Sequence, residues 1–171
     1  MQREAVVDRL CSEAVTRGTR IIRDKTAMKI GDRISIFMDR IGKGVVNGRV
    51  CIVLSDKYLK SAYCMHELFD VWRNCREDGD TLIARTRVFV LPSAKIATAV
   101  ERAQHVVHWQ GVFKAHDALV KEHGQFVLSD KDNVEFRLMS RFVSETANVL
   151  QLVQDILRPQ SFEDYVKHVF D

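Results

Sequence analysis

The chain has 171 residues, of which 46% are hydrophobic and 29% are charged, and a formal net charge of +3. This composition excludes a disordered chain and leaves room for one domain with a proper core. The charge is too small and too dispersed to indicate a nucleic-acid partner. No apolar run approaches the roughly 20 residues that cross a bilayer, so no membrane is expected. The four cysteines lack disulfide-framework spacing, and we expect reduced thiols in a cytoplasmic protein.

The first half of the chain alternates helical patterns with short apolar runs. Helical spacing covers residues 2–17 and stops at Gly18. Strands are predicted at residues 20–23, at Val50–Leu54 and at residues 87–91, where Pro92 closes the last one. Strands and helices that alternate at this spacing predict a parallel α/β sheet.

The segments between these strands read as a loop and two helices. The loop covers residues 24–30, and a helix follows over residues 31–41. A second, amphipathic helix carries Glu67 and runs to about Arg76. Glu67 therefore lies just beyond the carboxyl end of a core strand, which is where ligands bind in open α/β sheets.

The last third of the chain has helical pattern only. One long helix is predicted over residues 130–157, with Ser129 near its start, and Pro159 forces a break after it. Ser161 and Asp164 then resemble the start of a capped final helix. We expect this region to form a helical appendage on the sheet.

The segment Ser61-Ala-Tyr-Cys-Met-His-Glu-Leu68 carries the most functional information. It follows the apolar strand that ends in Ser55. Further upstream come Asp24, which follows a predicted strand, and Gly31, which closes the loop after that strand. This ordered set resembles a bacterial TIR (Toll/interleukin-1 receptor-like) domain. The resemblance covers residues 1–110 and implies a three-layer, flavodoxin-like parallel sheet flanked by helices. Residues 111–171 would then be the C-terminal helical extension.

One part of the family pattern has no counterpart here. TIR domains begin with a central strand, typically ending in F-I-S-Y, before the first helix, whereas this sequence starts inside that helix. We therefore expect an N-terminally truncated domain, with catalysis by the chain alone in question. Open sheet edges would favour association with other chains.

The resemblance implies an NAD+ hydrolase. Such an enzyme cleaves the nicotinamide–ribose bond to give nicotinamide and ADP-ribose or cyclic ADP-ribose, in bacterial antiphage defence or signalling. Glu67 matches the family's catalytic carboxylate, which would stabilise the positive charge that develops on the ribose. From spacing alone, a solvated helix glutamate is the better interpretation, and only the surrounding pattern favours catalysis.

The resemblance also implies a set of substrate-binding residues: Ser55, Tyr63, Cys64, Asp24, Lys25 and Lys29. Each has a plainer interpretation. Ser55 could cap the following helix, and Tyr63 could fill the core. Cys64 is better read as a small buried thiol than as a nucleophile, and the loop with its two lysines fits an ordinary exposed turn.

The expected ligands and partners follow from the same resemblance. NAD+ is the substrate, and no cofactor is expected. No metal is expected either, because Cys64-x-His66 lacks a second ligand pair for zinc. Self-association through TIR–TIR contacts is expected, as is a sensor or effector domain in a longer protein. The alternative function is a non-catalytic TIR scaffold for homotypic interaction. The missing strand favours the scaffold, and the retained Glu67 favours the enzyme.

Overall fold

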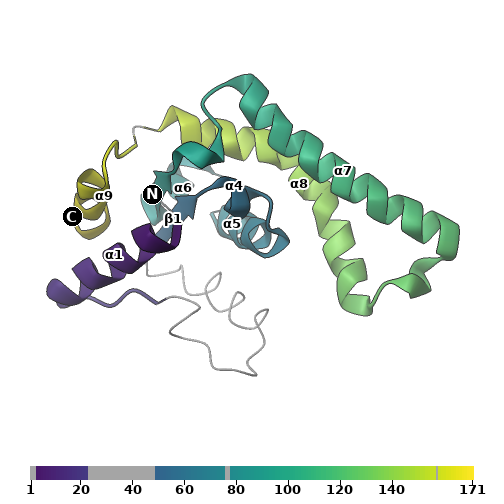
Figure 1. Ribbon diagram of the computed structural model, residues 1–171, viewed down its shortest axis with the longest axis horizontal. Helices are drawn as coiled ribbons and strands as arrows, with labels where there is room; N and C mark the ends of the chain where they lie inside the picture. Colours follow the sequence, from purple (N-terminus) through teal and green to yellow (C-terminus); the bar gives the residue numbers. More distant parts are fainter. Residues whose placement is uncertain (1–2, 23–48, 76–77, 157) are drawn as a thin grey trace.

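The chain is mostly helical. The computed structural model in Figure 1 describes residues 3–22, 49–75, 78–156 and 158–171. Helices account for 74% of these residues and strands for 7%. The helices are α1 (Arg3–Thr16), α4 (Asp56–Leu59), α5 (Ala62–Asn74), α6 (Gly79–Arg85), α7 (Ala99–His123), α8 (Asp130–Asp155) and α9 (Phe162–Phe170), with 3₁₀ turns η1 (Pro92–Ala94) and η2 (Gln125–Val127).

The described part of the chain contains one small sheet. Strands β1 (Val50–Leu54) and β2 (Thr86–Val90) pair in parallel, with Val50 opposite Thr86 and Leu54 opposite Val90. The strand predicted at Val50–Leu54 is confirmed, and the one predicted at residues 87–91 is confirmed with a shift of one residue. The predicted three-layer α/β fold with a TIR-type sheet is wrong, because the described residues are mostly helical and form two strands in place of the wider sheet that the resemblance implies.

The strand predicted near residue 20 shows why the sheet was overestimated. Arg20 to Ile22 have no regular structure in the described chain, and Ile22 is 65% exposed. Two isoleucines between arginines have strand propensity, but no packing surface covers the second of them, and strand propensity depends on such packing. After β2 the described chain is helical to its end. Residue 23, the loop at 24–30 and the helix at 31–41 lie outside the described residues.

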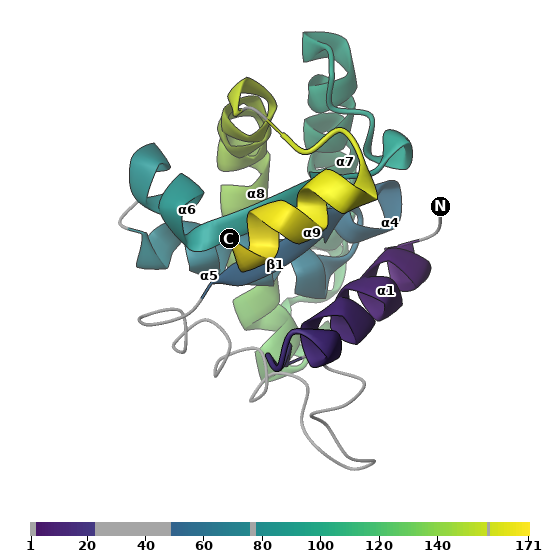
Figure 2. The ribbon, with the colours of Figure 1, turned by 90° about the vertical axis from the view of Figure 1, so that its left-hand side faces the viewer.

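Helices cover both faces of the two strands. Helices α1 and α9 lie together on one face, as Figure 2 shows, and they pack against Val53 and Leu91. The ring of Tyr165 on α9 stacks on Phe89 of β2, with 5.0 Å between the ring centroids. On the other face, Ile52 and Leu54 belong to the core that α5, α7 and α8 complete. Alternate residues of β1 thus serve different cores, as the two-residue period of a strand dictates.

The predicted helices of the described chain are confirmed within a few residues. Helix α1 ends before Gly18, which has a positive φ of 68°. Helix α8 starts with a capping box between Ser129 and Asp132, and Ser161 caps α9. Helices α7 and α8 pack as a long hairpin that projects from the sheet (Figure 1), with the rings of Phe113 and Phe136 stacked at 4.9 Å.

The helical hairpin bears on two other expectations. The predicted domain boundary at residue 110 lies inside helix α7, and helix α9, beyond that boundary, packs on the sheet. The division of the chain at residue 110 stays a prediction. Within the described part of the chain, no helix combines the length and the apolar character that crossing a membrane requires.

Candidate functional site

Two serines shape the chain after strand β1. The side-chain oxygen of Ser55 accepts a hydrogen bond from the backbone N–H of Tyr58 at 3.1 Å and so caps α4. Ser61 caps α5 in the same way, because its oxygen accepts from the N–H of Cys64 at 3.4 Å. The capping interpretation of Ser55 is therefore confirmed. Its role toward a ribose or phosphate oxygen stays a prediction.

Helix α5 has one buried side and one partly open side. Met65, Leu68 and Phe69 lie in the core between the sheet and α8. Glu67 is half-buried, Cys64 is half-buried, and Tyr63 is 44% exposed. This division follows the helical period, with apolar positions three and four residues apart. The catalytic candidate therefore lies at the margin of the core, where solvent can reach it.

Glu67 belongs to a group of side chains that we call the Tyr58 cluster, which consists of Arg3, Tyr58, Cys64 and Glu67. Tyr58 follows the end of β1 and is only 3% exposed. The guanidinium of Arg3 lies over its ring, 5.2 Å from the centroid. Glu67 and Cys64 lie on α5 within electrostatic range of the Tyr58 hydroxyl. The cluster joins α1, α4 and α5.

The electrostatics of the Tyr58 cluster hold the phenol in its neutral form. Burial raises the pKa of Tyr58 well above its ordinary value, and the negative charge of Glu67 raises this pKa further. The hydroxyl therefore stays protonated at neutral pH. It has no hydrogen-bond partner among the described residues. A buried donor in this state is unusual, since buried polar groups are nearly always paired.

Tyr63 is directed to a different neighbour. The ammonium of Lys131, in the first turn of α8, lies 5.3 Å from the centroid of the Tyr63 ring. It also donates a hydrogen bond to the Tyr63 hydroxyl at 3.5 Å, and this contact raises the pKa of Lys131. The aromatic ring at this position thus helps to attach α8 to α5. Its contact with substrate stays a prediction.

The predicted site residues are brought together only in part. Cys64 and Glu67 lie in one cluster, and Ser55 lies three residues before Tyr58 in the turn after β1. Asp24, Lys25 and Lys29 lie outside the described residues. None of the members of the Tyr58 cluster lines the pocket of about 360 Å³ that opens at the end of β2.

Sequence reasoning missed Tyr58 and Arg3. The signal for Tyr58 was present, because a large ring in the turn directly after a buried strand commonly packs beneath the next helix. Arg3 gave no such signal. Its contact with Tyr58 spans more than fifty residues of sequence and depends on how α1 crosses the sheet.

Comparison with known proteins finds no relative of this chain. No family model matches the sequence, and neither a curated protein nor a solved structure matches it significantly. The link to TIR domains therefore rests on the residues quoted above.

Proposed function

We propose that this chain is an NAD+ hydrolase that acts in the cytoplasm and uses Glu67 to stabilise the transition state. The observation that carries the proposal is the position of Glu67, which is half-buried on α5, the second helix after β1, within electrostatic range of the neutral phenol of Tyr58. The ordered residues around it, from Ser61 to Leu68, support the same activity through their resemblance to bacterial TIR domains. Four free cysteines fit a reducing compartment.

The proposal depends on the local unit β1–α4–α5 and not on a wide sheet. In this unit a parallel strand ends, the chain turns twice through capped helix starts, and α5 carries Glu67 within electrostatic range of Tyr58 in α4. Ligand sites lie at this edge of parallel sheets. The position of Glu67 therefore does not depend on how many strands the sheet has.

The proposed chemistry needs a charge near the reacting carbon. As nicotinamide leaves, the ribose carbon and ring oxygen share a positive charge, as in glycoside hydrolysis. A carboxylate in a partly desolvated position stabilises this charge more strongly than one in open water. Glu67 is such a carboxylate, because its side chain is half-buried in the folded chain.

Nicotinamide release by concentrated protein, followed by chromatography, tests the proposal. Wild-type protein should release nicotinamide from NAD+, and Glu67→Gln should lower the rate about hundredfold or more, because one electrostatic contact to the transition state is removed. Asp70→Asn is the matched control, since it removes a carboxylate from the same helix outside the Tyr58 cluster. It should keep the wild-type rate.

The competing outcomes separate clearly. Equal release by wild type and Glu67→Gln would end the role assigned to Glu67. An equal loss in Asp70→Asn would show a general effect of charge on α5. Thermal unfolding of all three proteins establishes that the variants are folded.

A non-catalytic scaffold is the second candidate function. The observation that favours it is a set of exposed apolar side chains on α7, η2 and α8: Val100 at 70%, Val107 at 62%, Phe126 at 100% and Val134 at 55%. Exposed apolar side chains mark a protein contact where they gather into one patch. Absence of nicotinamide release together with concentration-dependent self-association would place this candidate first.

A further inference from the structure

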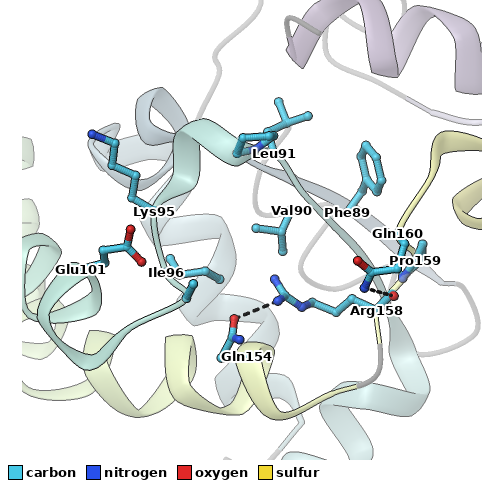
Figure 3. Close-up of a pocket in the computed structure, with 12 residues that line it drawn as sticks. Phe89, Val90, Leu91, Lys95, Ile96, Glu101, Gln154, Arg158, Pro159 and Gln160 are labelled. Atoms are coloured by element: carbon cyan, nitrogen blue, oxygen red, sulfur yellow. Dashed lines mark hydrogen bonds between the residues drawn. The ribbon is translucent and has the colours of Figure 1, made fainter.

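A pocket opens at the carboxyl end of β2, away from the Tyr58 cluster. Its volume is about 360 Å³, and its walls come from the end of β2, the turn after it, the first turn of α7, the last turn of α8 and residues 158–160 (Figure 3). Small-molecule sites have volumes of about 300–1,000 Å³. The pocket is therefore large enough for a small ligand and lies where parallel strands present ligand sites.

Arg158 is the charged side chain at the centre of this pocket. It is half-buried, and its side chain extends beneath Val90 toward Gln154 (Figure 3). One guanidinium nitrogen donates a hydrogen bond to the Gln154 side-chain oxygen at 2.8 Å. Of the residues that the structure describes, none with a carboxylate forms an ion pair with Arg158. A guanidinium has five N–H donors, so this cation can bind an anion in addition to the amide.

The one acidic side chain in the wall already has a structural role. Glu101 closes the capping box of α7, where its carboxylate accepts a hydrogen bond from the N–H of Thr98 at 3.0 Å. Its charge is offset there by the positive end of the helix. Lys95 stands at the rim and brings a second cation. The net electrostatic character of the pocket is therefore positive.

The remaining wall is apolar with amide groups at its margin. Phe89, Val90 and Ile96 form the apolar part, and the side-chain amides of Gln154 and Gln160 provide donors and acceptors. Arg102 donates to the carbonyl oxygens of Ile96 at 2.9 Å and Ala97 at 3.1 Å, which holds this part of the wall in place. A ligand that matches this surface has an apolar or planar body, hydrogen-bonding groups and a negative charge.

We propose that the pocket binds a small organic phosphate of the size of a nucleoside monophosphate, with its phosphate on Arg158 and its body against the apolar wall. The fork of an arginine binds phosphate oxygens in pairs, and the rim lysine adds to the attraction for a dianion. This inference concerns residues that the proposed NAD+ hydrolysis does not use.

Titration with adenosine 5′-monophosphate, followed by calorimetry or amide chemical shifts, tests the proposal. Wild-type protein should bind the probe, and adenosine should bind at least about tenfold more weakly, because it lacks the charge. Arg158→Gln should weaken binding about tenfold or more. Arg141→Gln removes an exposed cation from α8 outside this pocket and should bind like wild type.

Glu101→Gln gives a change of opposite sign. Glutamine can still close the capping box, so the helix start is retained while a negative charge leaves the wall. Binding of the phosphate should become tighter. Weaker binding in this variant would overturn the proposal, because it would mean that the pocket takes a cation or a zwitterion.

Three further results would also overturn it: no binding by wild type, equal binding of adenosine and its monophosphate, or equal weakening in Arg158→Gln and Arg141→Gln. Glu67→Gln should bind the probe as wild type does. Phosphate binding without nicotinamide release by the wild-type protein would leave this proposal standing and overturn the proposed hydrolase, and nicotinamide release without phosphate binding would do the reverse.

Discussion

The carboxyl ends of the two strands face different surroundings. Beyond β1, the chain places Tyr58 and Leu59 in the core, and both are almost fully buried. Beyond β2, the turn at residues 92–97 leaves a pocket of about 360 Å³ with Arg158 inside it. The first end is filled by an aromatic ring and presents a carboxylate at its margin. The second is open and presents a guanidinium.

The difference follows from what helix α7 contacts along its length. Its first turn borders the open pocket through Glu101. Trp109, about two turns later, donates a hydrogen bond from its indole nitrogen to the carbonyl oxygen of Leu59 at 2.9 Å. One helix thus leaves one strand end open and closes the other. Parallel strands place two ligand positions side by side, and the covering helix decides which of them has space.

Trp109→Phe should produce the largest loss of stability among the variants that probe this difference. The indole is 2% exposed, and the change removes both its hydrogen bond to Leu59 and part of the ring that fills the core. We expect the free energy of unfolding to fall by about 2–4 kcal/mol, measured by urea denaturation.

Tyr165→Phe is the comparison variant for Trp109→Phe. It removes a hydroxyl that donates to the carbonyl oxygen of Arg87 on β2 at 3.1 Å, with little change in volume. Its cost should be about 1 kcal/mol. If Trp109→Phe lowered the free energy of unfolding by no more than Tyr165→Phe does, the inference that α7 closes the β1 end would be wrong.

Tyr58→Phe should have a smaller effect, and one of the opposite sign. The Tyr58 hydroxyl is buried without a hydrogen-bond partner in the described part of the chain, so its removal relieves a desolvation cost. We expect the free energy of unfolding to stay level or to rise by about 1 kcal/mol in urea denaturation. Tyr63→Phe, at an exposed ring, should change it little. A loss of more than about 1 kcal/mol in Tyr58→Phe would mean that the hydroxyl is paired in the folded protein.

The two strand ends also differ in how far the sequence could predict them. At the β1 end, the buried run Val50–Leu54 and the helix with Glu67 follow from local patterns, because a strand buried on both faces and an amphipathic helix leave clear periodic signals. The capping serines Ser55 and Ser61 are equally local. Sequence reasoning therefore recovered the strand and the helix that carries Glu67, whereas the catalytic role of Glu67 stays a prediction.

The pocket at the β2 end could not be recovered in the same way. Its walls combine residue 90 with residues near 101 and 158, and Arg158 has no local pattern that marks it as a ligand-binding side chain. The predicted width of the sheet was wrong for a related reason. A short apolar run such as Ile21-Ile22 becomes a strand only if other elements bury it, and 65% exposure of Ile22 shows that nothing does.

The pH dependence of stability should give the smallest effect, and it isolates a face of α5 that serves neither strand end. His66 packs edge-on against Phe142 of α8, with 4.9 Å between the centroids, and burial lowers the pKa of His66. The charges of Glu135 and Asp70 act in the opposite direction, and those of Arg73 and Lys131 act in the same direction as burial. Because the folded protein holds the imidazole neutral, the unfolded chain takes up a proton first as the pH falls.

The stability from this neutral histidine is therefore fully present above the unfolded pKa of about 6.5 and is lost as the pH falls through the lower pKa of the folded protein. Urea denaturation at about pH 7.5 and about pH 5 should show a decrease that is smaller in His66→Gln than in wild type. The burial that lowers the pKa values of His108 and His168 should leave part of the decrease in the variant. An equal decrease in both proteins would mean that His66 is not held neutral against α8, and the α5–α8 contact that positions Glu67 would then be looser than the packing on Phe142 implies.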